Sequence, residues 1–347
     1  MGSEIKRSNK KYVLSAMILM LVIVVILGVA VGDVYVPFFN VVRIILKRWG
    51  LIKGTQISSA HEAIIFAVRF PRVVTAVLVG GALAVSGTVM QGMFRNPMAD
   101  PGLIGVSSGA SLGAVTAIAL GLTVRNLYFM PVLAAIGSLT VAFVIYILAG
   151  ANKKVPVLTL ILAGIAVSTF ISSITSMILL SFNQQNQIRE FLFWSVGGLN
   201  DRRWEHVKLI ILPIMIGIFV LMFFLKDLNI LLLGEEEAQS LGLNPVKTRR
   251  ILLVFSSIVT ATAISVSGNI SFVGLIVPHI MRLIVGPDHR VLLPVSLLGG
   301  SIFLVLCDLL GRVILPVEIN VGIITSLVGA PYFLYLLGRA RKGGSTF

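Results

Sequence analysis

The sequence is poor in cysteine and in charge. Cys307 is the only cysteine in 347 residues, which excludes an intramolecular disulfide and the usual multi-thiol zinc or iron–sulfur sites. Charged residues make up 12% of the chain, and its four histidines are scattered, so we expect no metal site and no cofactor. A hydrophobic content of 57% and a mean hydropathy of +1.00 exclude an ordinary soluble domain.

Three common catalytic motifs are also missing. There is no G-x-x-x-x-G-K-[S/T] phosphate loop, so the chain does not hydrolyse nucleotide by that route. His61 and Glu62 lack the second histidine of a metalloprotease helix, and no G-x-S-x-G nucleophile elbow occurs. We therefore expect a protein that is not an enzyme. A membrane enzyme would show nucleophiles or metal ligands clustered at one depth.

Long apolar runs are what the chain does have. Because a spanning helix needs roughly 20 apolar residues, the sequence predicts an all-α, polytopic protein with about ten transmembrane helices and one membrane domain over residues 1–347. The predicted spans are 12–31, 63–91, 103–121, 127–150, 155–181, 205–225, 248–267, 270–285, 291–311 and 321–338. The first is interpreted as an uncleaved span. The eighth is short for a bilayer and is expected to be re-entrant or broken.

Basic clusters near both ends predict the orientation. They comprise Lys6, Arg7, Lys10 and Lys11 at the start, and Arg339, Arg341 and Lys342 at the end. Because basic residues favour the cytoplasmic side, we expect both termini in the cytoplasm of a multi-pass cell-membrane protein, which requires an even number of spans. The net charge of +14 then reflects topology and contact with anionic lipid rather than nucleic acid.

Polar interruptions between the spans indicate more than an anchor. The run 95–102, R-N-P-M-A-D-P-G, must leave the apolar layer or be buried in protein, because hydrocarbon cannot satisfy loose backbone groups. It suits a protein that moves a cargo, or only a tight turn between helices. Small residues within the spans favour close helix packing, and a minority, including Ser168 and Ser172, are candidates for lining a pore.

An ion-driven carrier, the competing class of transporter, would carry charged residues deep within its spans. The predicted spans hold almost none apart from Asp308 and Glu318, near one end of the last spans. We therefore expect the energy to come from a separate protein. The segment 229–245 is a candidate contact for it, with an apolar helix followed by an acidic one that begins near Glu235 and stops at Gly242. The alternative is an interfacial helix lying on lipid.

The chain resembles the iron-chelate and cobalamin permease family, the membrane subunits of type II ABC importers for iron–siderophore complexes, haem and cobalamin. The resemblance extends over nearly the whole chain in family order. It rests on R-F-P-R at 69–72, G-G-A-L-A-V-S-G-T-V-M-Q at 80–91, R-N-P-M-A-D-P-G-L-I-G-V-S-S-G at 95–109, L-L-G-E-E-E-A-Q-S-L-G at 232–242, F-V-G-L-I-V-P-H-I-M-R at 272–282, D-H-R-V-L-L-P at 288–294 and G-A-P-Y-F at 329–333. Asn320 departs from the pattern, since the family usually has proline there.

The resemblance implies a homodimer around a central path, two ATPase subunits beneath it, and an external binding protein that delivers the ligand. The implied site residues fall into three groups: binding-protein docking at Arg69, Arg72 and Arg312; ATPase coupling at Gly234, Glu235, Glu236, Glu237, Gln239 and Gly242; and a cytoplasmic gate at Val157 and Leu158.

Two of the docking arginines have alternative roles. Arg72 could reach a lipid phosphate, and Arg312 could pair with Asp308 one turn earlier. For the cargo, an iron(III)–siderophore complex is the first expectation, followed by haem and cobalamin.

Overall fold

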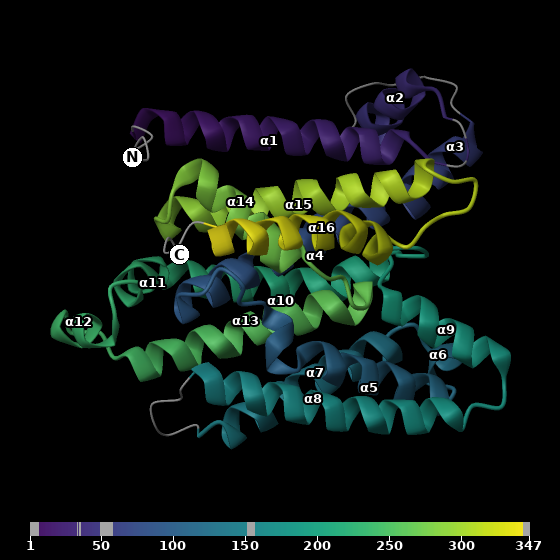
Figure 1. The fold of residues 1–347 in the computed structure, drawn as a ribbon. Helices are drawn as coiled ribbons and strands as arrows, with labels where there is room; N and C mark the ends of the chain where they lie inside the picture. The colour runs from purple at the N-terminus through teal and green to yellow at the C-terminus, as the bar shows by residue number, and fades with distance from the viewer. Residues whose placement is uncertain (1–6, 33, 35, 49–57, 151–156, 343–347) are drawn as a thin grey trace.

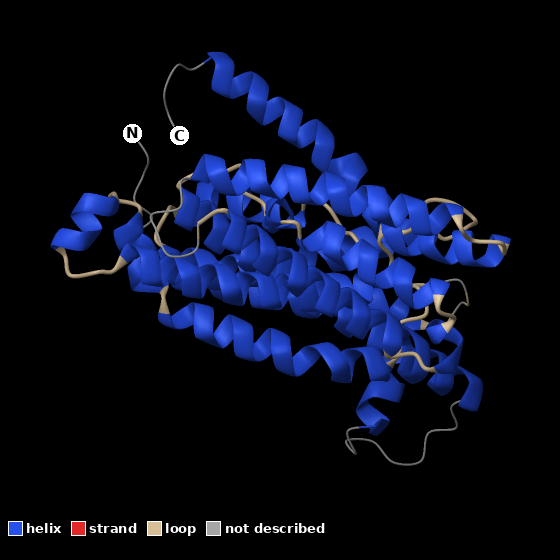
Figure 2. Ribbon diagram, turned by 90° about the horizontal axis from the view of Figure 1, so that it is seen from below, coloured by secondary structure: helices blue, strands red, loops and turns tan. Residues whose placement is uncertain are grey.

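The computed structural model describes residues 7–32, 34, 36–48, 58–150 and 157–342, and these residues form helices and loops without a β-strand (Figures 1 and 2). Ten helices correspond one for one to the predicted spans. They are α1 (Arg7–Ala30), α4 (Phe70–Phe94), α5 (Val106–Ala119), α7 (Phe129–Leu148), α8 (Val157–Leu180), α10 (Trp204–Phe223), α13 (Pro245–Ser267), α14 (Val273–Val285), α15 (His289–Val313) and α16 (Val321–Lys342). The prediction of a helical membrane protein is confirmed.

Shorter elements connect these helices. They are α2 (Phe38–Arg48), α3 (Ser59–Ala63), the π-helix η1 (Ile64–Arg69), the 3₁₀ turn η2 (Pro101–Ile104), α6 (Leu122–Arg125), α9 (Gln185–Val196), α11 (Leu225–Leu231) and α12 (Glu235–Ser240). The helical segment from Ser59 to Phe94 is continuous and mostly buried. It runs through the middle of the bundle, and its α4 part packs against α10, α13, α14 and α15.

Seven of the ten helices are long and apolar enough to cross a membrane, and α5, α14 and the apolar part of α16 are shorter. The predicted eighth span is the 13-residue helix α14. It starts late because Gly268 (φ 67°) ends α13 and Phe272 (φ 69°) interrupts the helical backbone. Ile270, in the connection, is only 5% exposed and its neighbours are partly buried, so this non-helical backbone is packed against protein, as it would have to be within hydrocarbon.

Glycine allows α4 to approach its neighbours very closely. A Cβ added at Gly87 would lie 1.8 Å from the carbonyl oxygen of Gly274, and one at Gly80 would lie 2.3 Å from that of Gly300. Both distances are far below van der Waals contact. The small residues predicted from the sequence thus bring α14 and α15 against the central helix.

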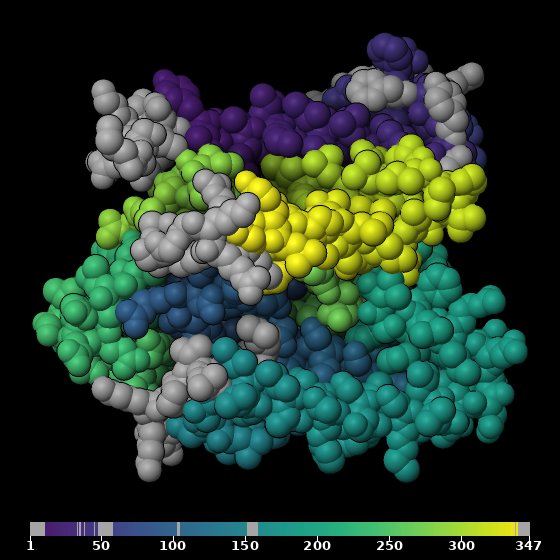
Figure 3. All heavy atoms as spheres, viewed as in Figure 1, coloured from purple at the N-terminus to yellow at the C-terminus, as the bar shows by residue number. Residues whose placement is uncertain are grey.

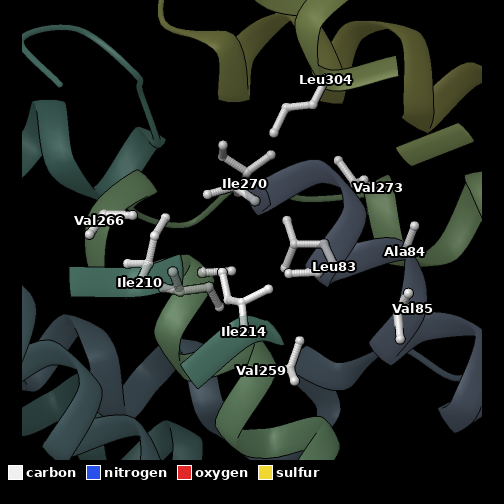
Figure 4. Packing of buried hydrophobic residues seen from close by; sticks show 14 of the residues in the cluster. Leu83, Ala84, Val85, Ile210, Ile214, Val259, Val266, Ile270, Val273 and Leu304 are labelled. Atoms are coloured by element: carbon white, nitrogen blue, oxygen red, sulfur yellow. The ribbon is translucent and has the colours of Figure 1, made fainter. Parts of the chain in front are cut away.

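The core lies where α4, α10, α13 and α15 meet. Figure 4 shows Leu83 of α4, Ile214 of α10 and Val259 of α13 grouped together, with Leu304 of α15 nearby. All four side chains are at most 4% exposed. Their packing fixes the helices that carry the two candidate sites described next.

The bundle has two distinct ends. The start of α1, the end of α16 and the pair α11–α12 lie at one end, and α2, α6 and α9 lie at the other (Figure 1). We refer to them as the α12 end and the α9 end. Figure 3 shows α16 (yellow) and α8 (teal) on the same face, with deeper elements visible between them. We call this side of the molecule the open face; both helices carry exposed large apolar side chains, among them Phe170 of α8 at 65% and Leu334 of α16 at 67%.

Candidate functional sites at the two ends of the bundle

Three arginines expected to act together do lie together at the α9 end. Arg72, near the start of α4, is 7% exposed and forms ion pairs with two carboxylates from distant parts of the chain. Its Nη2 lies 2.9 Å from Asp308 Oδ1, and its Nη1 lies 3.0 Å from Glu318 Oε1. Asp308 belongs to α15 and Glu318 to the loop that follows it, so Arg72 ties α4 to both.

Arg312 shares the same aspartate from the opposite side. Its Nη2 lies 2.5 Å from Asp308 Oδ2, one helical turn away, and its Nη1 donates to the carbonyl oxygens of Gly28 at 2.9 Å and Val31 at 3.0 Å. These carbonyls belong to the C-terminal end of α1, where the last turn of a helix leaves acceptors unsatisfied. Arg312 therefore joins α15 to α1 as well as to the aspartate.

Arg69 serves the same end of α1 and lies on η1, one turn before Arg72. Its Nη1 donates to the carbonyl oxygens of Ala30 at 2.8 Å and Val29 at 3.3 Å, and its Nη2 donates to that of Val34. The side chain is 5% exposed. Together, Arg69, Arg72 and Arg312 with Asp308 and Glu318 form what we call the arginine cluster.

The contacts within the arginine cluster bear on the roles predicted for its three arginines. The alternative role for Arg312, a pair with Asp308, is present in the structure. All three guanidinium groups are used inside the molecule, so docking of a partner stays a prediction that must account for these bonds. The sequence predicts Asp308 as a charged residue near one end of a span and as a possible partner of Arg312, but its contact with Arg72 across 236 positions has no local signal.

At the opposite end, two short helices occur, as predicted for the segment 229–245, but the first, α11, begins four residues before that segment and ends at Leu231. The apolar helix α11 is followed by the acidic helix α12, and Gly234 separates them at φ 135°, a conformation that side chains other than glycine avoid. The chain leaves α12 through Gly242 at φ 82°. There the backbone N–H of Leu243 donates to the Ala238 carbonyl at 3.0 Å, which closes the end of the helix.

One side of α12 is anchored and the other is free. Glu235 pairs with Arg249 of α13, and Ala238 is buried. Glu236, Glu237 and Gln239 are exposed, and the Glu237 carboxylate lies against Gly234. A short helix held in place by an ion pair and a buried alanine presents these three polar side chains in a fixed arrangement.

The predicted gate and pore residues lie on α8. Val157 and Leu158 begin this helix, and the structure does not describe their side chains. Ser168 is partly buried and accepts a hydrogen bond from Ser108 Oγ of α5 at 3.2 Å. Ser172 is exposed on α8. That these residues line a path therefore stays a prediction, and it concerns an assembly of more than one chain.

The polar run 95–102 is a compact turn between α4 and α5. Arg95 takes a left-handed conformation (φ 51°) that ends α4, and the Asp100 carboxylate accepts from the Gly102 N–H at 2.7 Å at the start of η2. These bonds satisfy backbone groups locally, in agreement with the tight-turn interpretation.

A cavity of about 610 Å³ lies at the α9 end. It is lined by α9 residues, among them Leu192 and Val196, and by the loop after α15, among them Glu318 and Asn320. The arginine cluster thus adjoins this cavity through Glu318. The sequence indicated no cavity here, because its walls come from segments more than one hundred positions apart.

Comparison with known proteins gives a consistent picture. A family model described as the FecCD transport family matches residues 20–339. The chain is 48% identical over 276 residues to the cobalamin import system permease protein BtuC of Halobacterium salinarum, covering 80% of this chain and 73% of that protein. It is 41% identical over 293 residues to the hemin transport system permease protein HmuU of Yersinia pestis, covering 83% and 87%. A solved structure described as an inward-facing conformation of a metal-chelate type ABC transporter aligns with a TM-score of 0.83 at 30% identity, over 95% of this chain and 99% of that one.

Proposed function

This chain belongs to the FecCD transport family and is a multi-pass membrane permease of an ABC importer, and we propose that its cargo is a metal chelate. The observation that carries the mechanism is α12, a short acidic helix fixed at one end of the bundle with three exposed polar side chains. A separate ATPase subunit would press on this helix. The bundle would pass that movement to a gate at the start of α8. In this proposal, both termini and α12 face the cytoplasm.

The open face of α8 and α16 supports a homodimer. It exposes large apolar side chains, including Leu162, Met177 and Leu327, each at least 57% exposed. In a bilayer such a face contacts lipid or another helix surface. We propose that a second copy packs here, so that Ser168, Ser172, Val157 and Leu158 border a central path. Two ATPase subunits would then sit beneath the pair, with a binding protein on the opposite side.

We propose that the binding protein docks at the arginine cluster by competing with the bonds inside it. Acidic residues of the partner would have to replace contacts that Arg72 already makes. Glu318 is the more easily displaced contact, because its side chain is 27% exposed and lies on a loop, whereas that of Asp308 is 1% exposed. A partner carboxylate would therefore take Arg72 Nη1 from Glu318 and release the loop that lines the cavity beside α9.

This proposal predicts opposite effects at the two ends of one ion pair. Glu318→Gln is expected to tighten docking of the binding protein several-fold, because Arg72 Nη1 loses its internal competitor. Arg72→Gln is expected to weaken docking about tenfold or more, the size of a lost charge-assisted hydrogen bond. Surface plasmon resonance on the reconstituted permease measures both, with exposed Arg125→Gln as control. Weaker docking in Glu318→Gln would contradict the competition.

Three metal chelates are candidates for the cargo. The first expectation from the family resemblance is an iron(III)–siderophore complex. Two other chelates are favoured by the relatives: cobalamin by the Halobacterium salinarum permease at 48% identity, and haem by the Yersinia pestis permease at 41%. All three are large metal complexes that a path between two copies could pass without gripping them tightly.

Reconstitution tests this function directly. The permease, its ATPase and the neighbouring binding protein would be placed in liposomes, and uptake of ferric siderophore, haem and cobalamin compared at equal concentration. We expect ATP-dependent uptake of one chelate, and mass spectrometry of the purified binding protein should find the same ligand. ATP-dependent uptake of none of the three would refute the proposed cargo class.

A further inference from the structure

A second cavity at the α9 end holds polar groups that nothing in the described structure satisfies. Its volume is about 480 Å³, and it lies between α7, α9, the loop before α10 and the end of α13. The lining includes Trp194, Asn200, Arg202, His206 and Glu190. No part of the coupling or docking proposals uses the cationic group in it, Arg202.

Arg202 is a largely buried cation without a carboxylate partner among the described residues. Its only hydrogen bond there links Nη1 to His206 Nε2 at 3.2 Å, and its buried Nε has no partner. Asp201 directly precedes Arg202 in the chain but forms no ion pair with Arg202 in the described structure. Burial lowers the pKa of Arg202 to about 10, against the opposing effect of Asp201. A buried, unpaired charge is costly, so an anion is the expected complement.

His206 does not fully relieve this cost. The ring is 3% exposed, and its Nδ1 accepts from the backbone N–H of Arg203 at 3.1 Å. A neutral imidazole with Nδ1 as acceptor carries its proton on Nε2, which then faces Arg202 with an N–H rather than a lone pair. In the other tautomer, Nε2 accepts from Arg202 and the Arg203 N–H loses its acceptor. One donor in this group is therefore always without an acceptor.

Two more lining residues have unsatisfied atoms in the described structure. Trp194 is 5% exposed, and its Nε1–H has no acceptor. The Oδ1 of Asn200 is buried without a donor, while its Nδ2 reaches Asn320 at 3.4 Å. Buried polar atoms are rarely left unpaired. Orphan donors on Trp194 and Arg202 beside one cavity indicate that an acceptor-rich group completes it.

We infer that this cavity is a binding site for an oxyanion, a carboxylate or phosphate group held by Arg202 with help from Trp194. A guanidinium matches both groups through its fork of N–H donors. Glu190 lines the same cavity and is largely exposed, and its carboxylate bonds to Thr123. It disfavours a second negative charge nearby, so a group of low charge fits best. This site does not depend on the import activity proposed above.

Three probes distinguish the source of the oxyanion. The purified full chain in neutral detergent receives inorganic phosphate or acetate at constant ionic strength set with chloride. In parallel it is placed in nanodiscs of phosphatidylcholine with or without phosphatidylglycerol. The thermal unfolding midpoint and isothermal titration report binding in Arg202→Gln, Glu190→Gln and Lys208→Gln, the last an exposed cation in the first turns of α10.

We expect at least one probe to stabilise the parent chain and to bind Arg202→Gln about tenfold or more weakly. Lys208→Gln should bind like the parent, and Glu190→Gln as tightly or more tightly. Without ligand, Arg202→Gln should melt no lower than the parent, since it removes an unpaired buried charge. An effect confined to phosphatidylglycerol would identify a lipid headgroup. Equal binding in parent and Arg202→Gln for all three probes, or no binding at all, would overturn the inference, as would a lower ligand-free midpoint in Arg202→Gln.

Discussion

Replacing Glu236 and Gln239 together with alanine is expected to reduce chelate uptake at least about thirtyfold while leaving membrane insertion intact. Both side chains are exposed on α12. The contacts that hold α12 to the bundle are instead the Glu235–Arg249 ion pair and the buried side chain of Ala238. If Glu236 and Gln239 contact the ATPase at the centre of a small interface, truncation costs about 2 kcal/mol or more. The ATPase would then hydrolyse ATP without driving uptake.

The measurement is ATP hydrolysis and chelate uptake in the same proteoliposomes, so that their ratio reports coupling. A matched control changes Glu205 and Gln184 to alanine, an acidic residue and a glutamine that are exposed near the α9 end. That control should keep the parent ratio. Uptake that survives replacement of the whole segment 234–242 would show that the ATPase pushes elsewhere.

Asp308→Asn is expected to destabilise the permease by about 3–5 kcal/mol, the usual cost of removing one partner of a buried ion pair. The side chain is 1% exposed and lies between Arg72 and Arg312, so neutralising it leaves two buried cations facing each other. Because the same carboxylate connects α4 and α15, and Arg312 extends the contact to α1, the three helices should separate more easily at the α9 end.

Thermal unfolding in detergent checks this result. Glu318→Gln is the control within the same cluster. Because the Glu318 carboxylate is partly exposed, its loss should lower the free energy of unfolding by less than about 1 kcal/mol. Adding Arg312→Gln to Asp308→Asn removes one uncompensated cation and should recover part of the loss. An Asp308→Asn protein as stable as Glu318→Gln would show that the arginine cluster does not hold these helices together.

The helices of this fold could be predicted from the sequence because their cause is local. Each apolar run long enough for a bilayer became a helix, and the short eighth run became α14. Helix α12 followed from an acidic first turn and glycines at both ends, whereas α11 lies four residues earlier than the apolar stretch predicted to form it. Gly234 and Gly242 adopt the positive φ values that make them boundaries.

The sites were only partly predictable because their causes are not local. Arg69, Arg72 and Arg312 were selected together and do lie together, but the sequence could not show that Arg72 and Asp308 meet across 236 positions. In the sequence, nothing distinguishes Arg202 from other cations in the connections between spans. Its burial beside Trp194 depends on how α9 folds against α7 and α13, which no nearby residue pattern indicates.

The most direct test of the central claim is concentrative uptake by the purified chain in liposomes, with and without its partners. Alone, under an imposed proton or sodium gradient, it should accumulate no chelate. With the ATPase, the binding protein and ATP, it should accumulate chelate against a gradient. Uphill uptake by the chain alone, driven by either ion, would contradict the account of a passive path opened by a separate motor.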